Sequence, residues 1–298
     1  MPDADDADRS DQTAAPGPSS ASPAPLVPGA RPTIGGLSPV LSRIGARPDA
    51  VDEMRGTIVS RSAIRRHERL RPATLMMLAD VVVGMRHEAR VEEWTFTTDY
   101  SWRLADRRPV AEGETITAAA RELRIGRRLI IEAVDYLDDS GALLASTQIT
   151  FMRTPQRPGD DPKPDISGVR ALMAGAPEEP LETPLVEAAG LEIIDAAAGT
   201  VRLEISDRIR RPGGMVQGSI MTLLGEVAAE TMAEHTLGGP CIVTGLDVRY
   251  LLGGRTGPLV TRSSWVGPPE RGTVAVDVVD TGRDDALTTT FYVQVEPL

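Results

Sequence analysis

Two segments of the chain are apolar on nearly every side when they are drawn as helices. The first spans about residues 72–86 and contains Asp80, and the second spans residues 217–235 and contains Glu226. Pro72 suits the first turn of a helix, where its missing N–H leaves no hydrogen bond unmade. A helix without a polar face is stable only when it is buried. The pattern therefore predicts two long helices that the rest of the fold covers.

Short runs of strand character surround each of these helices. They span residues 94–104, 114–125, 128–137 and 142–153 in the first half, and residues 191–205, 242–252, 259–266, 273–280 and 286–295 in the second half. Val274, Val276 and Val278 alternate with polar or small residues, which is typical of a sheet with one buried face. The order predicts an α+β fold in which each half is a curved antiparallel sheet wrapped around one long apolar helix.

The two halves repeat one another at a fixed distance. Three pairs of residues are each separated by 146 positions: Asp80 and Glu226, Thr98 and Thr244, and Arg103 and Arg249. Three matches in one register indicate a duplicated domain. We therefore expect two domains, at residues 35–155 and 181–298.

Two polar segments lie outside these domains. Residues 1–34 are rich in Asp, Ala, Pro and Ser and contain few bulky apolar side chains, so we expect a disordered N-terminal tail. Residues 156–180 are rich in proline and are predicted to be a linker, with a helical turn near Val169–Met173.

Composition and charge narrow the class of protein. Hydrophobic residues make up 41% of the sequence and aromatic residues 3%, so the cores are expected to be aliphatic. A single cysteine excludes a disulfide framework and fits a reducing compartment. The N-terminus lacks the layout of a signal peptide, and no apolar run reaches the roughly 18 residues of a membrane span, so we expect a cytoplasmic protein. The net charge of −11 argues against nucleic acid as the main partner.

The three histidines, His67, His87 and His235, show no spacing typical of metal ligands. His87 and His235 lie at the ends of the two predicted helices, where a cation suits the helix dipole. We therefore expect structural histidines, no metal ion and no cofactor.

A family resemblance lies in the second predicted helix and in the strand after it. Their sequences are Arg211-Pro-Gly-Gly-Met-Val-Gln-Gly-Ser-Ile-Met-Thr-Leu-Leu-Gly-Glu226 and Val243-Thr-Gly-Leu-Asp-Val-Arg-Tyr-Leu251. These segments resemble the hotdog-fold acyl-CoA thioesterases of the phenylacetyl-CoA thioesterase-like (PaaI-like) family, whose motif combines an Asn, a His-Gly-Gly and an acid farther along the helix. The Asn and the His are absent from both copies. The resemblance covers about residues 40–155, more weakly, and residues 181–298, and it implies a double hotdog that hydrolyses acyl-CoA.

In that family the active sites lie between two hotdog units, so the resemblance implies two sites in this chain. In the first site Gly218 supplies a backbone N–H to the thioester oxygen, and Gln217 replaces the family's His. Asp80 acts on water as a general base or attacks the thioester itself, and Thr98 orients it. The apolar neighbours of Asp80 are expected to raise its pKa by desolvation.

The second implied site joins the Arg71-Pro72 turn with Glu226 and Thr244. Pro72 has no N–H and therefore lacks the donor that a developing oxyanion needs. We expect the first site to be the better candidate. Glu226 and Thr244 stay candidates if another N–H replaces the missing donor.

Structural roles explain the same residues without catalysis. Asp80 can be a buried acid bonded to its neighbours, Gln217 a helix-start residue, and Gly218 a position of close helix packing. For the whole chain, the missing Asn and His leave a non-catalytic acyl-CoA binder as the alternative function. A hotdog hydratase is disfavoured because neither helix start offers a His. The sequence leaves open whether two chains assemble into a homo-oligomer.

Overall fold

The computed structural model describes residues 39–156, 163–175, 179–211 and 213–298. The predicted tail, residues 1–34, and part of the predicted linker lie outside the described residues. No helix in the described ranges combines the length and the hydropathy that a membrane crossing requires.

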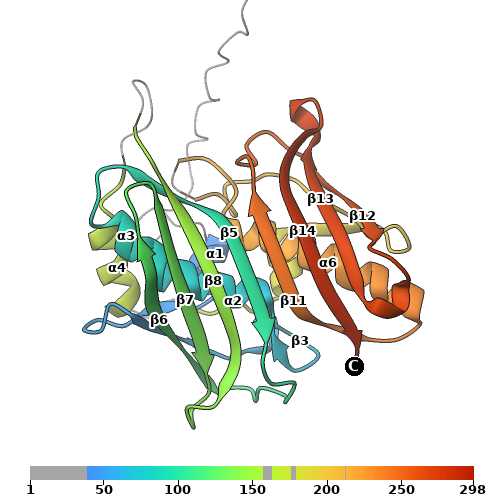
Figure 1. The fold of residues 1–298 in the computed structure, drawn as a ribbon, viewed down its shortest axis with the longest axis horizontal. Helices are drawn as coiled ribbons and strands as arrows, with labels where there is room; N and C mark the ends of the chain where they lie inside the picture. Colours follow the sequence, from blue (N-terminus) through green and yellow to red (C-terminus); the bar gives the residue numbers. More distant parts are fainter. Residues whose placement is uncertain (1–38, 157–162, 176–178, 212) are drawn as a thin grey trace, which may run out of the picture. The chain divides into compact units, whose positions relative to one another are not determined.

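Within these ranges, twelve antiparallel strands form one sheet (Figure 1). In the first half they are β1 (Arg47–Pro48), β2 (Arg55–Val59), β5 (Trp94–Leu104), β6 (Thr115–Ile125), β7 (Leu129–Leu137) and β8 (Leu143–Thr154). In the second half they are β9 (Leu191–Asp195), β10 (Thr200–Leu203), β11 (Cys241–Tyr250), β12 (Leu259–Trp265), β13 (Thr273–Asp280) and β14 (Ala286–Pro297). Their order across the sheet is β1-β2-β6-β7-β8-β5-β11-β14-β13-β12-β10-β9. The strands of each half are therefore contiguous, and the predicted strands are confirmed.

The two halves meet where β5 pairs with β11. On this seam Arg103 pairs with Asp247 and Arg249 pairs with Asp99, each at 2.8 Å. The two arginines are one of the repeated pairs found in the sequence. Both ion pairs are partly exposed and contribute little to stability, so the backbone hydrogen bonds between the strands hold the seam.

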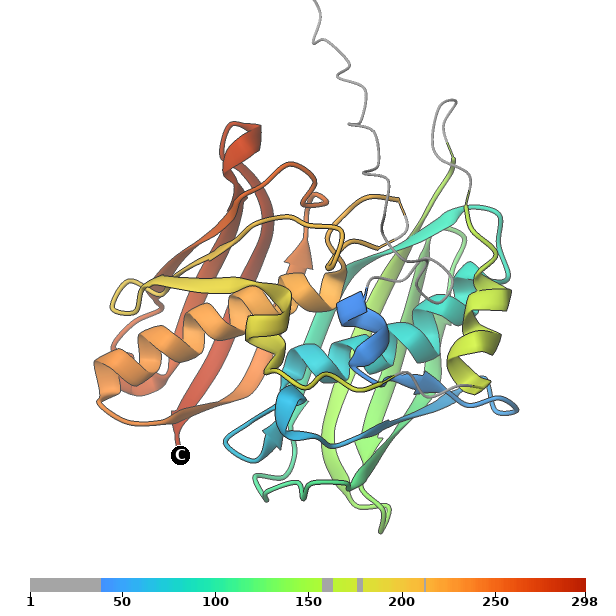
Figure 2. The same cartoon turned by 180° about the vertical axis from the view of Figure 1, so that it is seen from behind.

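Two long helices lie against one face of the sheet (Figure 2). In the first half α2 (Pro72–Ala79), a π-helix, η3 (Asp80–Gly84), and α3 (Met85–Glu88) follow without a break, and in the second half α6 (Gly218–Leu237) runs for 20 residues. Most of their side chains are buried. Both helices begin and end within two residues of the predicted positions, as expected for segments without a polar face.

Two buried tyrosines tie the first helix to the sheet. Tyr136 Oη, on β7, donates to the carbonyl oxygen of Leu75 at 2.8 Å, and Tyr100 Oη, on β5, donates to that of Pro72 at 3.4 Å. Because a buried hydroxyl without a partner is unfavourable, these bonds favour one placement of α2 over the strands. They thereby position the start of the helix that carries Asp80.

Part of the predicted linker is a helix, α4 (Ile166–Gly175), which packs against α3 and β1. Ile166, Val169 and Met173 are buried along one side of it. Asp165 caps its start by accepting a hydrogen bond from the N–H of Gly168 at 3.1 Å. The helical turn predicted near Val169–Met173 is thus part of a longer, docked helix.

The remaining elements are short. They are α1 (Pro39–Arg43), α5 (Leu185–Ala189), the hairpin of β3 (Arg65–Arg66) and β4 (Arg69–Leu70), and the turns η2 (Ser62–Ile64), η4 (Pro269–Arg271) and η5 (Thr281–Arg283).

Candidate functional site

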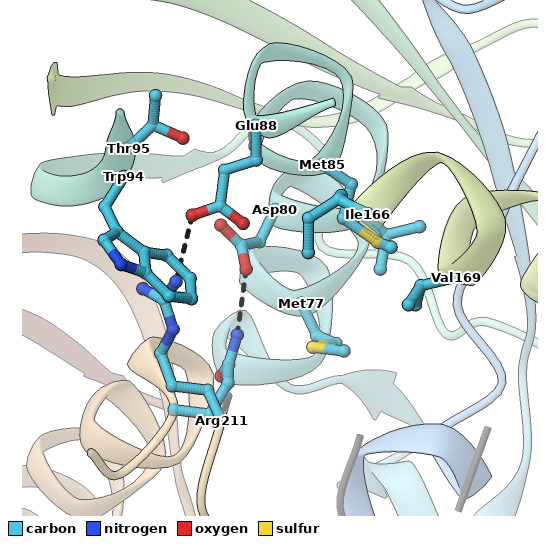
Figure 3. A pocket seen from close by; sticks show the side chains of 12 residues that line it. Met77, Asp80, Met85, Glu88, Trp94, Thr95, Ile166, Val169 and Arg211 are labelled. Atoms are coloured by element: carbon cyan, nitrogen blue, oxygen red, sulfur yellow. Dashed lines mark hydrogen bonds and ion pairs between the residues drawn. The ribbon is translucent and has the colours of Figure 1, made fainter. Parts of the chain in front are cut away.

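Asp80 is the first residue of the π-helix, and its carboxylate contacts both halves of the chain. Its Oδ2 accepts a hydrogen bond from Nε2 of Gln217 at 3.0 Å, drawn as the dashed line from Asp80 in Figure 3. Its Oδ1 lies 3.5 Å from the hydroxyl of Thr97, a long hydrogen bond. The structure therefore brings Asp80 and Gln217, two of the residues singled out in the sequence, into direct contact.

The surroundings of Asp80 change its acidity. Desolvation raises its pKa from 3.8 to about 6, against the lowering effect of the Arg211 guanidinium. The nearby Glu88 carboxylate raises the pKa further, and the hydrogen bonds from Gln217 and Thr97 lower it. Desolvation is the largest of these effects, as expected for an acid surrounded by apolar side chains. A carboxyl with this pKa is ionised at neutral pH and can still accept a proton during a reaction.

Asp80 also lines a cavity with about 50 Å³ of space for water-sized groups (Figure 3). The lining residues are Met77, Asp80, Val81, Gly84, Met85, Glu88, Trp94, Thr95, Ile166, Val169, Arg211 and Gln217. In Figure 3, Trp94 and Arg211 lie on one side of Asp80, and Ile166 and Val169 lie on the other. A mostly apolar cavity with a few converging polar groups is the usual form of a small-molecule site.

Gln217 has two roles in one side chain. Its Oε1 accepts hydrogen bonds from the N–H and the hydroxyl of Ser219. Gln217 thereby caps the start of α6. Because Oε1 is occupied by donors, the amide presents its NH₂ group to Asp80. The helix-start role and the site role that the sequence suggested for Gln217 are therefore compatible.

Gly218 is the first residue of α6 and directly follows Gln217. Its N–H donates to no residue that the structure describes, and it lies at the positive end of a 20-residue helix. Gly218 does not itself line the cavity, which Gln217 does. A Cβ at this position would lie 3.0 Å from Cε of Met76. An N–H of this kind is a suitable donor to a developing negative charge.

Tyr250, on β11, holds the first turn of α6 in place. Its Oη lies 2.6 Å from the hydroxyl of Thr222 and donates to the carbonyl oxygen of Gly218 at 3.2 Å. Burial raises the pKa of Tyr250, so it stays a neutral donor. Tyr250 was not singled out from the sequence, where it is one aromatic residue in a strand.

Thr97, rather than Thr98, reaches Asp80. The pairing of β5 with β8 shifts between Thr97 and Asp99, so Thr98 is an extra residue at a β-bulge. Its hydroxyl donates to the carbonyl oxygen of Thr150 at 3.3 Å. This corrects the residue expected from the sequence, because a repeat spacing locates the strand but does not reveal a bulge within it.

Arg211, Glu88 and Trp94 line the cavity but were not predicted as site residues. Arg211 pairs with Glu88 at 2.9 Å, and its guanidinium lies 5.2 Å from the ring centre of Trp94 and 4.9 Å from that of Phe96. Arg211 comes from the second half and reaches the first-half helix. The sequence contains three arginines close together, Arg208, Arg210 and Arg211, and nothing in it indicates which of them enters the cavity.

The second implied site is filled by the protein's own side chains. Arg71 Nη1 lies 2.5 Å from Oε1 of Glu226 and 3.0 Å from Oε2 of Glu230, and all three residues are buried. The N–H of Ala73 donates to Oε2 of Glu226 at 3.0 Å. Burial raises the pKa of Glu226, and Arg71 opposes that rise. Pro72 has no N–H, and the next N–H in the chain, that of Ala73, is already bound to Glu226. It is therefore not free to replace the missing donor to a thioester oxygen.

Thr244 does not reach the acid of this second site. A bulge lies between Val243 and Gly245 in the pairing of β11 with β14, at the position equivalent to the bulge in β5. The Thr244 hydroxyl donates to Oε1 of Glu296 at 2.9 Å. Val243 takes the place that a threonine has in the first half, and the cavity that remains beside Glu226 has about 20 Å³.

Comparisons with known proteins bear on the fold. No protein-family model matches the sequence, and no curated protein matches it. An acyl-ACP thioesterase from Bacteroides thetaiotaomicron is 13% identical with a TM-score of 0.53, and the match covers 83% of this chain and 100% of that one. A tesB protein from Mycobacterium avium subs. paratuberculosis is 14% identical with a TM-score of 0.53, over 86% and 96% of the two chains. A conserved protein with a hot dog fold from Alicyclobacillus acidocaldarius is 14% identical with a TM-score of 0.52, over 87% and 98%.

The chain has a hotdog fold. Its antiparallel sheet and the long buried helices on one face agree with the α+β class expected from the sequence. At 13–14% identity the likeness shows the hotdog fold alone. The chemistry of this hotdog protein must be argued from the residues of its own site.

Proposed function

We propose that this protein hydrolyses acyl thioesters, and that its substrates are acyl-CoA molecules. The observation that carries the proposal is the 3.0 Å hydrogen bond between Nε2 of Gln217 and Oδ2 of Asp80. It joins an acid of raised pKa to the start of a helix, beside a small apolar cavity. The N–H of Gly218, the next residue, has no partner in the described part of the chain.

In the proposed reaction the thioester carbonyl oxygen accepts a hydrogen bond from the Gly218 N–H, which stabilises the negative charge that develops there. Ionised Asp80 takes a proton from a water molecule while the water oxygen attacks the carbonyl carbon. The tetrahedral intermediate then collapses, the C–S bond breaks, and the proton on Asp80 passes to the leaving thiolate. The products are a carboxylic acid and a free thiol.

Direct attack by Asp80 on the carbonyl carbon is the other route expected from the sequence. It would form an anhydride between the acyl group and the enzyme, which mass spectrometry of rapidly quenched protein would detect. The hydrogen bonds from Gln217 and Thr97 are compatible with both routes, because each carboxylate oxygen keeps a lone pair that can take a proton or attack a carbonyl carbon. Detection of the anhydride would favour direct attack, and its absence would favour the general-base route.

We further propose that the chain is a double hotdog of domains 35–155 and 181–298, with its site between the two units. The repeat of 146 residues, the contiguous strands of each half and the matching bulges at Thr98 and Thr244 support this arrangement. The donor side of the site, Gln217 and Gly218, comes from one unit, and the acid, Asp80, comes from the other. The PaaI-like resemblance of the second unit supports the choice of acyl-CoA.

The test is release of free thiol from acyl-CoA substrates by the wild type and by Asp80→Asn. Loss of a general base is expected to lower kcat by about 100-fold or more. Asp277→Asn, an exposed acid on β13, is the matched control and is expected to keep wild-type activity. Full activity in Asp80→Asn would show that Asp80 is not the catalytic acid.

The second candidate function is a non-catalytic acyl-CoA binder. The absence of the family's Asn and His from both copies favours it. It predicts saturable binding of acyl-CoA by calorimetry with no thiol release at high protein concentration. Any turnover that depends on Asp80 ends this alternative.

A further inference from the structure

One wall of the Asp80 cavity is made by α4. In the sequence this helix lies between the two repeated units. Ile166 and Val169 line the cavity together with Met77 and Met85 of the first long helix (Figure 3). Ile166 and Val169 are three residues apart on a helix and therefore share one face. This wall is apolar, whereas the polar lining groups are on the helix that carries Asp80, on β5 and on the segment before α6.

The position of α4 is held by specific bonds. Nζ of Lys163, three residues before the helix, donates to the carbonyl oxygens of Glu88, Val91 and Glu93 at 2.5, 2.9 and 2.8 Å. These carbonyls lie at and just beyond the end of α3, where a helix leaves acceptors unpaired. Asp165 caps the first turn of α4. The start of α4 is thus fastened to the end of the helix that carries the acid.

The size of the cavity limits what fits between Asp80 and α4. The space is about 50 Å³, enough for a few water-sized groups. A short acyl tail fills a space of this size, and a long one does not fit in it.

We propose that the cavity receives the acyl tail of the substrate, and that Ile166 and Val169 of α4 are specificity-determining residues that restrict it to short acyl chains. This inference rests on the proposed hydrolysis at Asp80. The carbonyl lies at the Asp80 and Gln217 end, and the tail runs toward α4. Residues of the intervening segment, rather than those of either repeated unit, thereby select the substrate.

The experiment compares kcat/KM for straight-chain acyl-CoA substrates of two to ten carbons. In Val169→Ala the wall recedes, so the optimum moves to longer chains, and the ratio of hexanoyl to butyryl turnover rises by about fourfold for each methylene that gains room. In Val169→Leu the cavity shrinks, and acetyl-CoA is favoured over butyryl-CoA by a similar factor. Ratios within one variant do not depend on how much of the protein is folded.

Met173→Ala is the matched control. Met173 is buried on the same face of α4 but does not line the cavity. This variant is expected to lose thermal stability and to keep the wild-type order of preference among chain lengths. The same change of preference in Met173→Ala would show that loosening α4, rather than the shape of the cavity, is responsible.

Failure of the inference and failure of the proposed function give different results. If thioesters are hydrolysed but both Val169 variants keep the wild-type preference, the role of α4 is overturned and hydrolysis stands. If the wild type hydrolyses no thioester, the proposed function fails. Calorimetry with non-hydrolysable alkyl-CoA thioethers of the same lengths then tests the cavity, because binding needs no turnover. Affinities that do not depend on chain length, or that Val169→Ala leaves unchanged, overturn the inference.

Discussion

Desolvation raises the pKa of Asp80, and the Arg211 guanidinium opposes that rise more than any other group. Arg211 is kept beside the cavity by the Glu88 carboxylate and by the ring faces of Trp94 and Phe96. A general base must be ionised at the working pH and still take up a proton in the transition state, and a pKa of about 6 meets both needs. In the proposed reaction Arg211 is thus a positioning residue, because it lowers the pKa of Asp80.

Hydrolysis is expected to increase with pH through a midpoint near 6, because the reaction needs ionised Asp80. In Arg211→Gln the cation that lowers this pKa is lost and Glu88 is left unpaired. Both changes disfavour the carboxylate, so the midpoint moves upward by about 1 pH unit. The measurement is kcat/KM against pH for both proteins.

Arg262→Gln serves as the control for the pH profile. Arg262 is exposed and pairs with Asp285 at 2.7 Å, and this pair is remote from the residues that line the cavity. The midpoint of the pH profile of Arg262→Gln is expected to equal that of the wild type. A midpoint that stays in place or moves downward in Arg211→Gln contradicts the proposed influence of Arg211 on Asp80.

At the scale of elements, the first long helix changes from α to π geometry at Asp80, where the N–H of Met85 donates to the Asp80 carbonyl oxygen. Such turns are rare and often occur at functional sites. Gly84 ends the π-helix and leaves space for the carboxyl. A Cβ on Gly84 would lie 2.6 Å from Oδ1 of Asp80 and 3.1 Å from Cε1 of Phe151.

Gly84→Ala is therefore expected to displace the Asp80 carboxyl and to lower kcat by about 10- to 100-fold. Gly225→Ala on α6 is the control, because its Cβ would meet the ring of Phe291 at 2.7 Å and introduces similar strain away from the cavity. Both variants lose stability, but only Gly84→Ala loses kcat. Added to Asp80→Asn, Gly84→Ala is expected to reduce kcat no further. A large additional loss would mean that Gly84 acts on something other than Asp80.

At the scale of the whole molecule, the two acids that the sequence singled out have different surroundings. Asp80 lies beside a cavity, and Glu226 belongs to a buried ionic cluster. In that cluster Arg71 binds Glu226 and Glu230, and Arg66 reaches Glu230 and Glu234. The cluster joins the start of the first long helix to the middle of α6. It therefore links the two halves beside the smaller of the two cavities described above.

Removal of one partner from a buried ion pair leaves an uncompensated charge. Arg71→Met is expected to lower the free energy of unfolding by about 3–5 kcal/mol, because Glu226 and Glu230 lose their shared cation. Urea denaturation measures the change. Arg249→Met at the seam between β5 and β11 is the control, since its ion pair is half-exposed and is worth less than about 1 kcal/mol. Equal losses in the two variants would argue against a structural role for the cluster.

Much of the fold could be predicted from the sequence, and less of the site. The two helices and the long strands follow from hydrophobic periodicity, which reports locally which residues face a core. The contact between Gln217 and Asp80 joins residues 137 positions apart. The family resemblance suggested that these two residues share a site, but the orientation of each side chain depends on how α6 packs against the first helix. The bulge at Thr98 adds one residue to β5, and this shift turns Thr97 instead of Thr98 toward the helix. Hydrophobic periodicity does not reveal a shift of one residue.

The sequence by itself determined the elements of this protein, their order, and the presence of an acid in each buried helix, because these depend on neighbours within a few turns of chain. Only the tertiary structure decided which of the two acids, Asp80 or Glu226, is held in an ion pair and so is unavailable to a substrate. Arg71 fills the space beside Glu226 from 155 positions away, and Arg211 reaches the cavity of Asp80 from the other half. The helix α4 supplies one wall of that cavity from a segment whose composition suggested a linker. Partners brought together by packing leave no mark in the local pattern of hydrophobic and polar residues.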